Sequence, residues 1–262
     1  MRTIDKLKKD IRALFRNPKP VFFDHLPKCA GSSLRVHIER QYSTHRIFET
    51  VEKNQKKNTA QFKLLPLKKK RKYTAVYGHA IRPLLKEIRE DMIRITIFRN
   101  PIDRAISLYF YIKRTPHHRL YSSITDNNIS LKDFCAEKHN ILQVRNWYVK
   151  YFSGLSHEQI KKQSDYAVNL AFKNIMNDYD LIGFQNEYNA FIKHLDAIAG
   201  FQPSKEDSMV RNATANRLKV SELTEVELKS ISENNILDIQ LFQKLDAQKK
   251  EGVILAGRFL QE

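Results

Sequence analysis

Short apolar runs alternate along the chain with segments whose apolar residues recur at helical spacing. The runs are rich in β-branched and aromatic residues, which is typical of buried strands. They comprise Val21 to Phe23, Tyr73 to Tyr77, Met92 to Phe98 and Asp180 to Phe184. After the first run, Leu34, Ile38 and Tyr42 recur every four residues and so lie on one face of a helix. This alternation predicts an α/β fold, a single domain with a central, largely parallel sheet flanked by helices.

The second half of the chain is mostly helical by the same criterion, so we expect a helical C-terminal part. Asn100 is typical of a helix N-cap, Pro101 of the first helical position and Asp103 of the first turn. Further helices are predicted over residues 83–90, 141–152, 164–177, 187–199, 221–232 and 235–250. Residues 43–72 are polar and lysine-rich, and apart from a short strand at Ile47-Phe48 they predict a surface excursion.

Residues 4–15 carry the pattern of a basic amphipathic helix. Its apolar face comprises Ile4, Leu7, Ile11, Leu14 and Phe15. Such a helix either docks on the body of the protein or makes a peripheral contact with an anionic membrane. Asn17-Pro18-Lys19-Pro20 then breaks the pattern. The expected organisation is therefore an N-terminal helical segment over 1–20 and one domain over 21–262.

Composition sets the class of protein and of its partners. The chain has 262 residues, 42% of them hydrophobic, which is enough for a sizeable core. Lys and Arg total 46 against 29 Asp and Glu, a net charge of +17 that predicts an anionic partner such as nucleic acid, acidic glycan, nucleotide or membrane surface. Cys29 and Cys135 are the only cysteines, which excludes a disulfide framework. No apolar run approaches the ~20 residues of a bilayer span and no signal-peptide core is present, so we expect no transmembrane segment and a cytoplasmic location.

A loop of small residues joins the first predicted strand to the first predicted helix, and it has the features of an anion site. The loop runs from Pro27 to Ser33. Helix starts leave N–H groups unpaired and carry partial positive charge, so they attract phosphate or sulfate. Lys28 adds a full charge, and Ser32 and Ser33 add hydroxyl donors. The loop is not a Walker A motif, because Lys28 precedes its only glycine, Gly31.

A second strand also ends in a helix start, over Ile97 to Tyr109. Arg99 lies at the end of the strand, while Arg104 and Ser107 lie on nearly the same face of the helix. A guanidinium group binds phosphate oxygens bidentately, so this stretch suits a second phosphate. Two such sites at the ends of two strands predict a bis-phosphorylated nucleotide at the sheet edge, where open α/β sheets usually bind ligands.

These two stretches together resemble the signature of a known family. The loop LPKCAGSS is similar to the 5′-phosphosulfate loop of the PAPS-dependent sulfotransferases, where PAPS is 3′-phosphoadenosine 5′-phosphosulfate, and FRNPIDRAISLY is similar to their 3′-phosphate motif. The Gly-His segment from Val76 to Ala80 resembles the carbohydrate branch that includes the heparan and uronyl 2-O-sulfotransferases. Weaker similarities to that branch lie at Leu142 to Arg145, Phe152 to Gly154 and Tyr179 to Phe184.

The resemblance implies a P-loop-like nucleotide fold and transfer of a sulfuryl group from PAPS to a carbohydrate hydroxyl without a metal, and an acidic glycan is one candidate acceptor. By motif position, Lys28 would contact the bridging oxygen of the donor and His79 would take the proton of the acceptor. Arg99 and Ser107 would hold the 3′ phosphate. The 5′ phosphate would be held by Cys29, Ala30, Gly31, Ser32 and Ser33. The loop departs from the family at Cys29, where a Thr or Ser is common and a hydroxyl donor is therefore lost.

Several alternatives stay open from the residues alone. Cys29 and Arg35 have the C-x5-R spacing of cysteine-dependent phosphatases, in which a thiolate attacks a phosphate held by arginine. The charge would also suit a basic nucleic-acid-binding protein, although no recognised module is present and specific nucleic-acid binding is not expected. His79 has a structural alternative, and the run from Lys68 to Lys72 is either solvated or attracts an acidic glycan. Candidates for closing over the nucleotide are Arg211, Asn212, Thr214 and Lys219.

Overall fold

The computed structural model describes residues 17–50, 55–136, 144–203 and 217–261. The chain divides into two compact units. The first comprises Met1–Phe98, Asn177–Asn212 and Lys250–Glu262, and the second comprises Arg99–Met176 and Ala213–Lys249. The predicted helix over 4–15 and the candidates Leu142, Gln143, Arg211, Asn212 and Thr214 lie outside the described residues. The organisation into one domain over 21–262 stays a prediction.

The first unit is built on a six-stranded sheet with the order β2-β3-β1-β4-β5-β6. The strands are β1 (Val21–Asp24), β2 (Ile47–Glu49), β3 (Ala75–Gly78), β4 (Ile93–Phe98), β5 (Leu181–Phe184) and β6 (Val253–Leu255). β1 to β5 pair in parallel, and β6 pairs antiparallel with β5. The predicted α/β class and largely parallel sheet are therefore confirmed.

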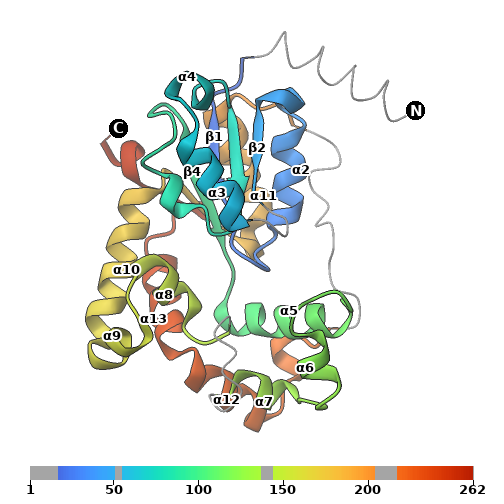
Figure 1. The fold of residues 1–262 in the computed structure, drawn as a ribbon. Helices are drawn as coiled ribbons and strands as arrows, with labels where there is room; N and C mark the ends of the chain where they lie inside the picture. The colour runs from blue at the N-terminus through green and yellow to red at the C-terminus, as the bar shows by residue number, and fades with distance from the viewer. Residues whose placement is uncertain (1–16, 51–54, 137–143, 204–216, 262) are drawn as a thin grey trace. The chain divides into compact units, whose positions relative to one another are not determined.

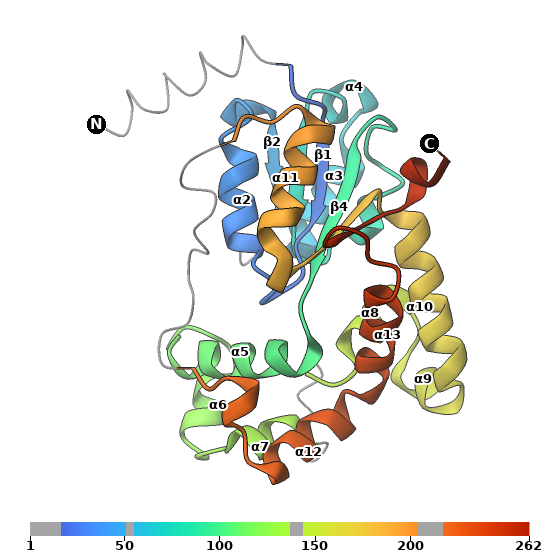
Figure 2. The same cartoon turned by 180° about the vertical axis from the view of Figure 1, so that it is seen from behind.

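Helices cover both faces of this sheet. Figures 1 and 2 show α2 (Gly31–Glu39) and α11 (Tyr188–Ala199) on one face and α3 (Gln55–Leu64) on the other. On the α3 face, Phe62 joins a buried apolar cluster with Phe22 of β1 and Val76 of β3. The prediction of a surface excursion over 43–72 is therefore wrong, because the side chain of Phe62 fixes this lysine-rich segment to the core as a helix.

The remaining short elements of the first unit also depart in part from prediction. They are α4 (Leu67–Lys70) and the 3-10 turns η1 (Thr44–Arg46), η2 (Arg82–Leu84), η4 (Gln185–Glu187) and η6 (Gly257–Gln261). Where a helix was expected over 83–90, the structure has only η2 followed by turns. Arg82 donates from Nε to Asp178 Oδ2 at 2.7 Å, and Leu84 packs into the same apolar cluster as Phe62.

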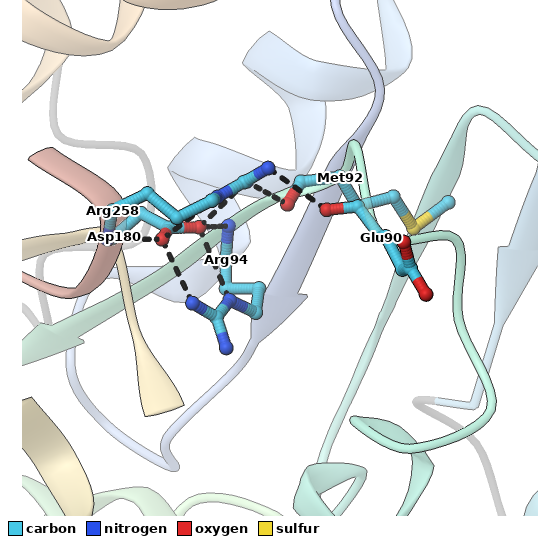
Figure 3. A network of polar contacts seen from close by, with 5 residues as sticks. All are labelled: Glu90, Met92, Arg94, Asp180 and Arg258. Carbon is cyan, nitrogen blue, oxygen red and sulfur yellow. Dashed lines mark hydrogen bonds and ion pairs between the residues drawn. The ribbon is translucent and has the colours of Figure 1, made fainter. Parts of the chain in front are cut away.

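A buried ionic network holds the amino-terminal edge of the sheet together (Figure 3). Asp180, directly before β5, is 0% exposed. Its carboxylate accepts from the backbone N–H of Arg94 at 2.8 Å and from the guanidinium groups of Arg94 at 2.9 Å and Arg258 at 3.0 Å. Arg258 also donates to the carbonyl oxygens of Glu90 at 2.8 Å and Met92 at 2.5 Å. The C-terminal segment is thereby tied to two strands of the sheet.

The second unit is helical. Its elements are α5 (Pro101–Lys113), α6 (Tyr121–Thr125), α7 (Leu131–Cys135), α8 (Trp147–Ser153), α9 (His157–Lys162), α10 (Ser164–Asp178, whose last two residues belong to the first unit), η5 (Val220–Glu222), α12 (Glu225–Asn234) and α13 (Ile236–Asp246). Oδ1 of Asn100 accepts from the N–H groups of Ile102 and Asp103 at 3.0 and 3.3 Å, as the predicted cap requires. The predicted helical C-terminal part is confirmed. Within the ranges described above, no helix combines the length and apolar character needed to cross a membrane.

Candidate active site

The loop after β1 has an unusual backbone. Lys28 and Ala30 both adopt the left-handed region, with φ of 68° and 61°. Such conformations are uncommon outside glycine and tend to occur at ligand sites. Gly31 then begins α2, and a Cβ at this position would lie 1.8 Å from Cδ2 of His25. The loop therefore requires glycine at 31, because the ring of His25 occupies the space of any side chain there.

The loop presents unpaired amide donors. The N–H groups of Ser33 and Leu34 donate to the carbonyl of Ala30 at 3.1 and 3.4 Å. Across the described part of the chain, the N–H groups of Ala30, Gly31 and Ser32 have no acceptor, and Ala30 provides no side-chain cap. Amide groups in successive left- and right-handed conformations form anion-binding concavities, which the helix dipole reinforces. The local geometry therefore suits a phosphate or sulfate group, as the sequence predicts.

The same geometry does not suit a cysteine-dependent phosphatase. Cys29 is 1% exposed, and its thiol donates to the carbonyl of Pro27 at 3.5 Å. Arg35 binds Glu49 instead, with 3.0 Å between Nη1 and Oε1. A nucleophilic thiolate must face the bound phosphate, and here the sulfur is buried while the arginine is held by a carboxylate.

His79 lies where β3 ends, against His25, the first residue after β1. The ring centroids of His79 and His25 are 4.1 Å apart, and His25 stacks in turn on Phe23 at 5.3 Å. Nδ1 of His79 lies 2.5 Å from the backbone carbonyl oxygen of His25. Because a carbonyl only accepts, Nδ1 carries the proton in the neutral ring, and Nε2 is left with a lone pair. The ring of His79 is thus oriented by the carbonyl of His25, with Nε2 as its hydrogen-bond acceptor.

The surroundings of His79 keep its ring neutral. Burial lowers the pKa of His79 below its ordinary value of 6.5; the hydrogen bond to the carbonyl of His25 opposes this, and the positive charges of Arg35 and Lys28 lower the pKa further. The pKa of His25 is also lowered, by burial and then by the charges of His79, Arg35 and Lys28. At neutral pH His79 is therefore available to accept a proton.

The second predicted anion site lies in the second unit, at the start of α5. Arg99 donates from Nε to Asp103 Oδ2 at 2.6 Å, and Arg217 reaches the other oxygen of the same carboxylate with 2.5 Å between Nη1 and Oδ1. Burial would raise the pKa of Asp103, but the hydrogen bonds from Arg217 and Arg99 lower it below its ordinary value. Asp103 therefore holds two guanidinium groups together. Ser107, one turn further along α5, is buried at 3% exposure.

Arg104 does not belong to this group. It is 1% exposed, and its guanidinium lies over the rings of Trp147 and Tyr148, with 5.1 and 4.9 Å to the ring centroids. Asp238 lies near enough for its pKa to be lowered by the charge of Arg104, although burial raises that pKa to about 6 overall. Arg104 is thus part of the packing of the second unit, as Tyr148 is.

The structure adds residues that the sequence does not single out. His25 orients His79 and fills the space beside Gly31, and its only sequence signal is its place between the strand and the loop. Arg217 joins Arg99 through Asp103, whereas Lys219, the nearest predicted candidate, is the N-cap of the short turn η5. The predicted residues themselves fall into two groups. Lys28, Cys29, Ala30, Gly31, Ser32, Ser33 and His79 lie in the first unit, and Arg99 and Ser107 lie in the second.

Comparison with known proteins bears on this site. No protein-family model matches the chain. Among curated proteins, it is similar to one named heparin sulfate O-sulfotransferase from Drosophila melanogaster, with 25% identity over 175 residues. The similarity covers 60% of this chain and 49% of that protein, so the chain spans about half the length of its curated relative. The resemblance that the two motifs indicate is thereby confirmed, and the chain is a distant relative of the carbohydrate sulfotransferases.

Proposed function

We propose that the protein is a PAPS-dependent sulfotransferase that transfers a sulfuryl group to a hydroxyl of a carbohydrate. The observation that carries the proposal is that backbone amides without acceptors, at the start of α2, and a neutral histidine, His79, occur at the same edge of the sheet. The amides of Ala30, Gly31 and Ser32 suit the phosphate of a leaving group. His79 suits the removal of a proton from an attacking hydroxyl, because its Nδ1 donates to the carbonyl of His25 and its Nε2 is left as the acceptor. Kinship with a sulfotransferase supports this assignment over other phosphate chemistry.

The resemblance of each motif to the family assigns each group of residues to one phosphate of the donor. The loop from Lys28 to Ser33 would hold the 5′ phosphate, since it offers amides, hydroxyls and a cation in one segment. Arg99 and Ser107, joined by Arg217, would hold the 3′ phosphate, for which two guanidinium groups provide bidentate donors. When bound, PAPS supplies an activated sulfuryl group with a nucleotide as its leaving group.

The residues of the loop edge then have distinct tasks. Nε2 of His79 takes the proton of the acceptor hydroxyl as its oxygen becomes nucleophilic, and the resulting imidazolium keeps its Nδ1 hydrogen bond to the carbonyl of His25. Lys28 and the loop amides stabilise the negative charge that develops on the leaving phosphate. Because these donors are fixed by the fold, little reorganisation is needed during transfer. The excess of positive charge favours an acidic glycan as acceptor.

The proposal is tested first by ligand binding. 3′-Phosphoadenosine 5′-phosphate at about 100 times its Kd should add about 2.7 kcal/mol of stability. In a chain of this length that corresponds to a rise in Tm of roughly 5–10 °C, and AMP, which lacks the 3′ phosphate, should give much less. Equal shifts with both nucleotides, or no shift with either, would contradict the proposed donor.

Transfer is tested with labelled PAPS and a panel of acidic and neutral glycans. Lys28→Ala should abolish transfer and weaken nucleotide binding, because both depend on its charge. Lys57→Ala is the matched control, since Lys57 is an exposed lysine of α3 outside the proposed site. Labelling of a glycan by the wild type and the control, but not by Lys28→Ala, is the expected result; equal labelling by all three would refute the mechanism.

A further inference from the structure

The turn between α3 and α4 exposes two large apolar side chains. Leu64 is 84% exposed and Leu67 is 60% exposed, and only Leu65 and Pro66 separate them in sequence. Within the described part of the chain, these are the two highest exposures among large hydrophobic residues. Burying either side chain against water would be favourable, so their exposure requires an explanation.

The turn is held rigidly by its neighbours on the inner side. Phe62 is 1% exposed, and Leu65 packs against the cluster that contains it. Lys70, at the end of α4, is also buried; its Nζ donates to Glu87 at 2.6 Å and to the carbonyl of Lys63 at 2.9 Å. With both sides of the turn fixed in this way, the fold itself keeps Leu64 and Leu67 exposed; Figure 1 shows the ends of α3 and α4 that the turn joins.

The surface around the two leucines is strongly positive. Residues 55 to 72 include eight Lys and Arg and no Asp or Glu. Lys63, Lys68, Lys69 and Lys72 are all exposed, and they flank the leucines in sequence on both sides. The combination of an apolar tip and a cationic rim is complementary to a surface that is anionic outside and apolar within.

We propose that the turn formed by residues 63–69 docks on an anionic lipid bilayer, with Leu64 and Leu67 entering the headgroup region. Lysines near an anionic leaflet are each attracted to it, and apolar side chains add to the binding when they reach the acyl boundary. A soluble polyanion such as an acidic glycan or a nucleic acid would use the lysines but would leave the leucines in water. The leucines therefore favour a lipid partner over a polyanion.

The test uses the full chain carrying a single reporter cysteine. Leu67→Cys is labelled with the environment-sensitive dye NBD; the native Cys29 and Cys135 are 1% and 0% exposed and so are protected from the reagent. Leu255→Cys is the matched control, because Leu255 is an exposed leucine of β6, 41% exposed, in the same unit. Vesicles of phosphatidylserine and phosphatidylcholine should shift the emission of the label at 67 to the blue and raise its intensity, whereas phosphatidylcholine alone should not. The label at 255 should respond to neither.

A second measurement separates lipid docking from plain charge attraction. Leu64→Asn with Leu67→Asn should weaken binding to the anionic vesicles by about 10-fold or more, since apolar burial contributes to interfacial binding. The same double variant should elute from heparin at the salt concentration of the wild type and should melt at the same temperature, because both side chains are exposed. An unshifted emission of the label at 67, or vesicle binding that the double variant leaves unchanged, would overturn the proposal. A loss of heparin binding equal to the loss of vesicle binding would also overturn it and would assign the surface to a polyanion.

Discussion

Replacing Asp180 by Asn should remove a defined part of the stability of the fold. The carboxylate is fully buried and accepts from two guanidinium groups and one backbone amide. Burial alone would raise the pKa of Asp180, but the hydrogen bonds from Arg94 and Arg258 lower it from an ordinary 3.8 to about 2. The ionised carboxylate is therefore more stable in the folded chain than in the unfolded one.

The size and sign of the effect follow from that difference in pKa. A lowering from 3.8 to about 2 corresponds to roughly 2 kcal/mol of folding free energy. Because the folded pKa is the lower one, this contribution is complete above the ordinary pKa and is lost as the pH falls through the folded value. About 1 kcal/mol should be gone at pH 3 and most of the remainder near pH 2. At neutral pH the Asn variant should lose more, about 3–5 kcal/mol, because it leaves Arg94 and Arg258 without their carboxylate.

Urea denaturation followed by circular dichroism at pH 7, 4 and 3 measures these quantities. The gap in unfolding free energy between wild type and Asp180→Asn should narrow by about 1 kcal/mol from pH 7 to pH 3, since only the wild type loses the carboxylate. Asp246→Asn is the control, because Asp246 forms a surface ion pair with Lys249 and such pairs contribute about 1 kcal/mol or less. Free energies that fall in parallel for wild type and Asp180→Asn would refute the argument.

Three further predictions concern the proposed site. His79→Ala should lower turnover by about 10² to 10⁴ with nucleotide affinity nearly unchanged, and an equal loss of nucleotide affinity would make His79 structural. In the wild type, kcat/KM should fall only below pH 6.5, because burial lowers the pKa of this base. A pH profile of kcat/KM for the wild type and the variant checks both expectations. Gly31→Ala should displace the ring of His25 and abolish the Tm shift caused by the nucleotide, with an intact shift counting against the close packing. Arg217→Ala should reduce the affinity for 3′-phosphoadenosine 5′-phosphate but not for AMP in calorimetric titrations, and equal losses for both would remove Arg217 from the 3′-phosphate group.

Much of the sheet could be predicted from the sequence because parallel strands are buried on both faces. Val21 to Phe23 is a continuous apolar run for that reason, and Met92 to Phe98 is apolar except for Arg94 and Thr96. The helix α3 could not be predicted in the same way, since its lysines and glutamines hide a periodicity that rests on Phe62. β6 is not predicted either, because its three residues follow closely on the helix expected over 235–250 and no further strand pattern surrounds them.

The proposed site could be predicted only where one segment supplies it. The loop from Lys28 to Ser33 and the start of α5 are each continuous in sequence, so their chemistry is visible in the order of residues. His25 and Arg217 join the proposed site through tertiary contacts. His25 contacts His79, and Arg217 contacts Asp103. No local pattern encodes such a contact, since it depends on how β3 lies beside β1 and on where the chain returns after residue 216.

The two edges of the sheet differ in the polar groups and backbone conformations that they carry. At the amino-terminal edge, the buried Asp180 receives donors from two strands and the C-terminal segment. At the carboxyl-terminal edge, Lys28 and Ala30 have positive φ, the amides of Gly31 and Ser32 have no acceptor within the described chain, and Nδ1 of the buried His25 has no partner there either. A buried group without a partner, such as Nδ1 of His25, costs about 1–3 kcal/mol, and left-handed backbone at non-glycine residues such as Lys28 and Ala30 costs a similar amount, so a fold keeps them only where other contacts hold the backbone in place. The packed sheet and the Asp180 network provide those contacts, and the strained edge is therefore the one where binding a ligand would recover the most free energy.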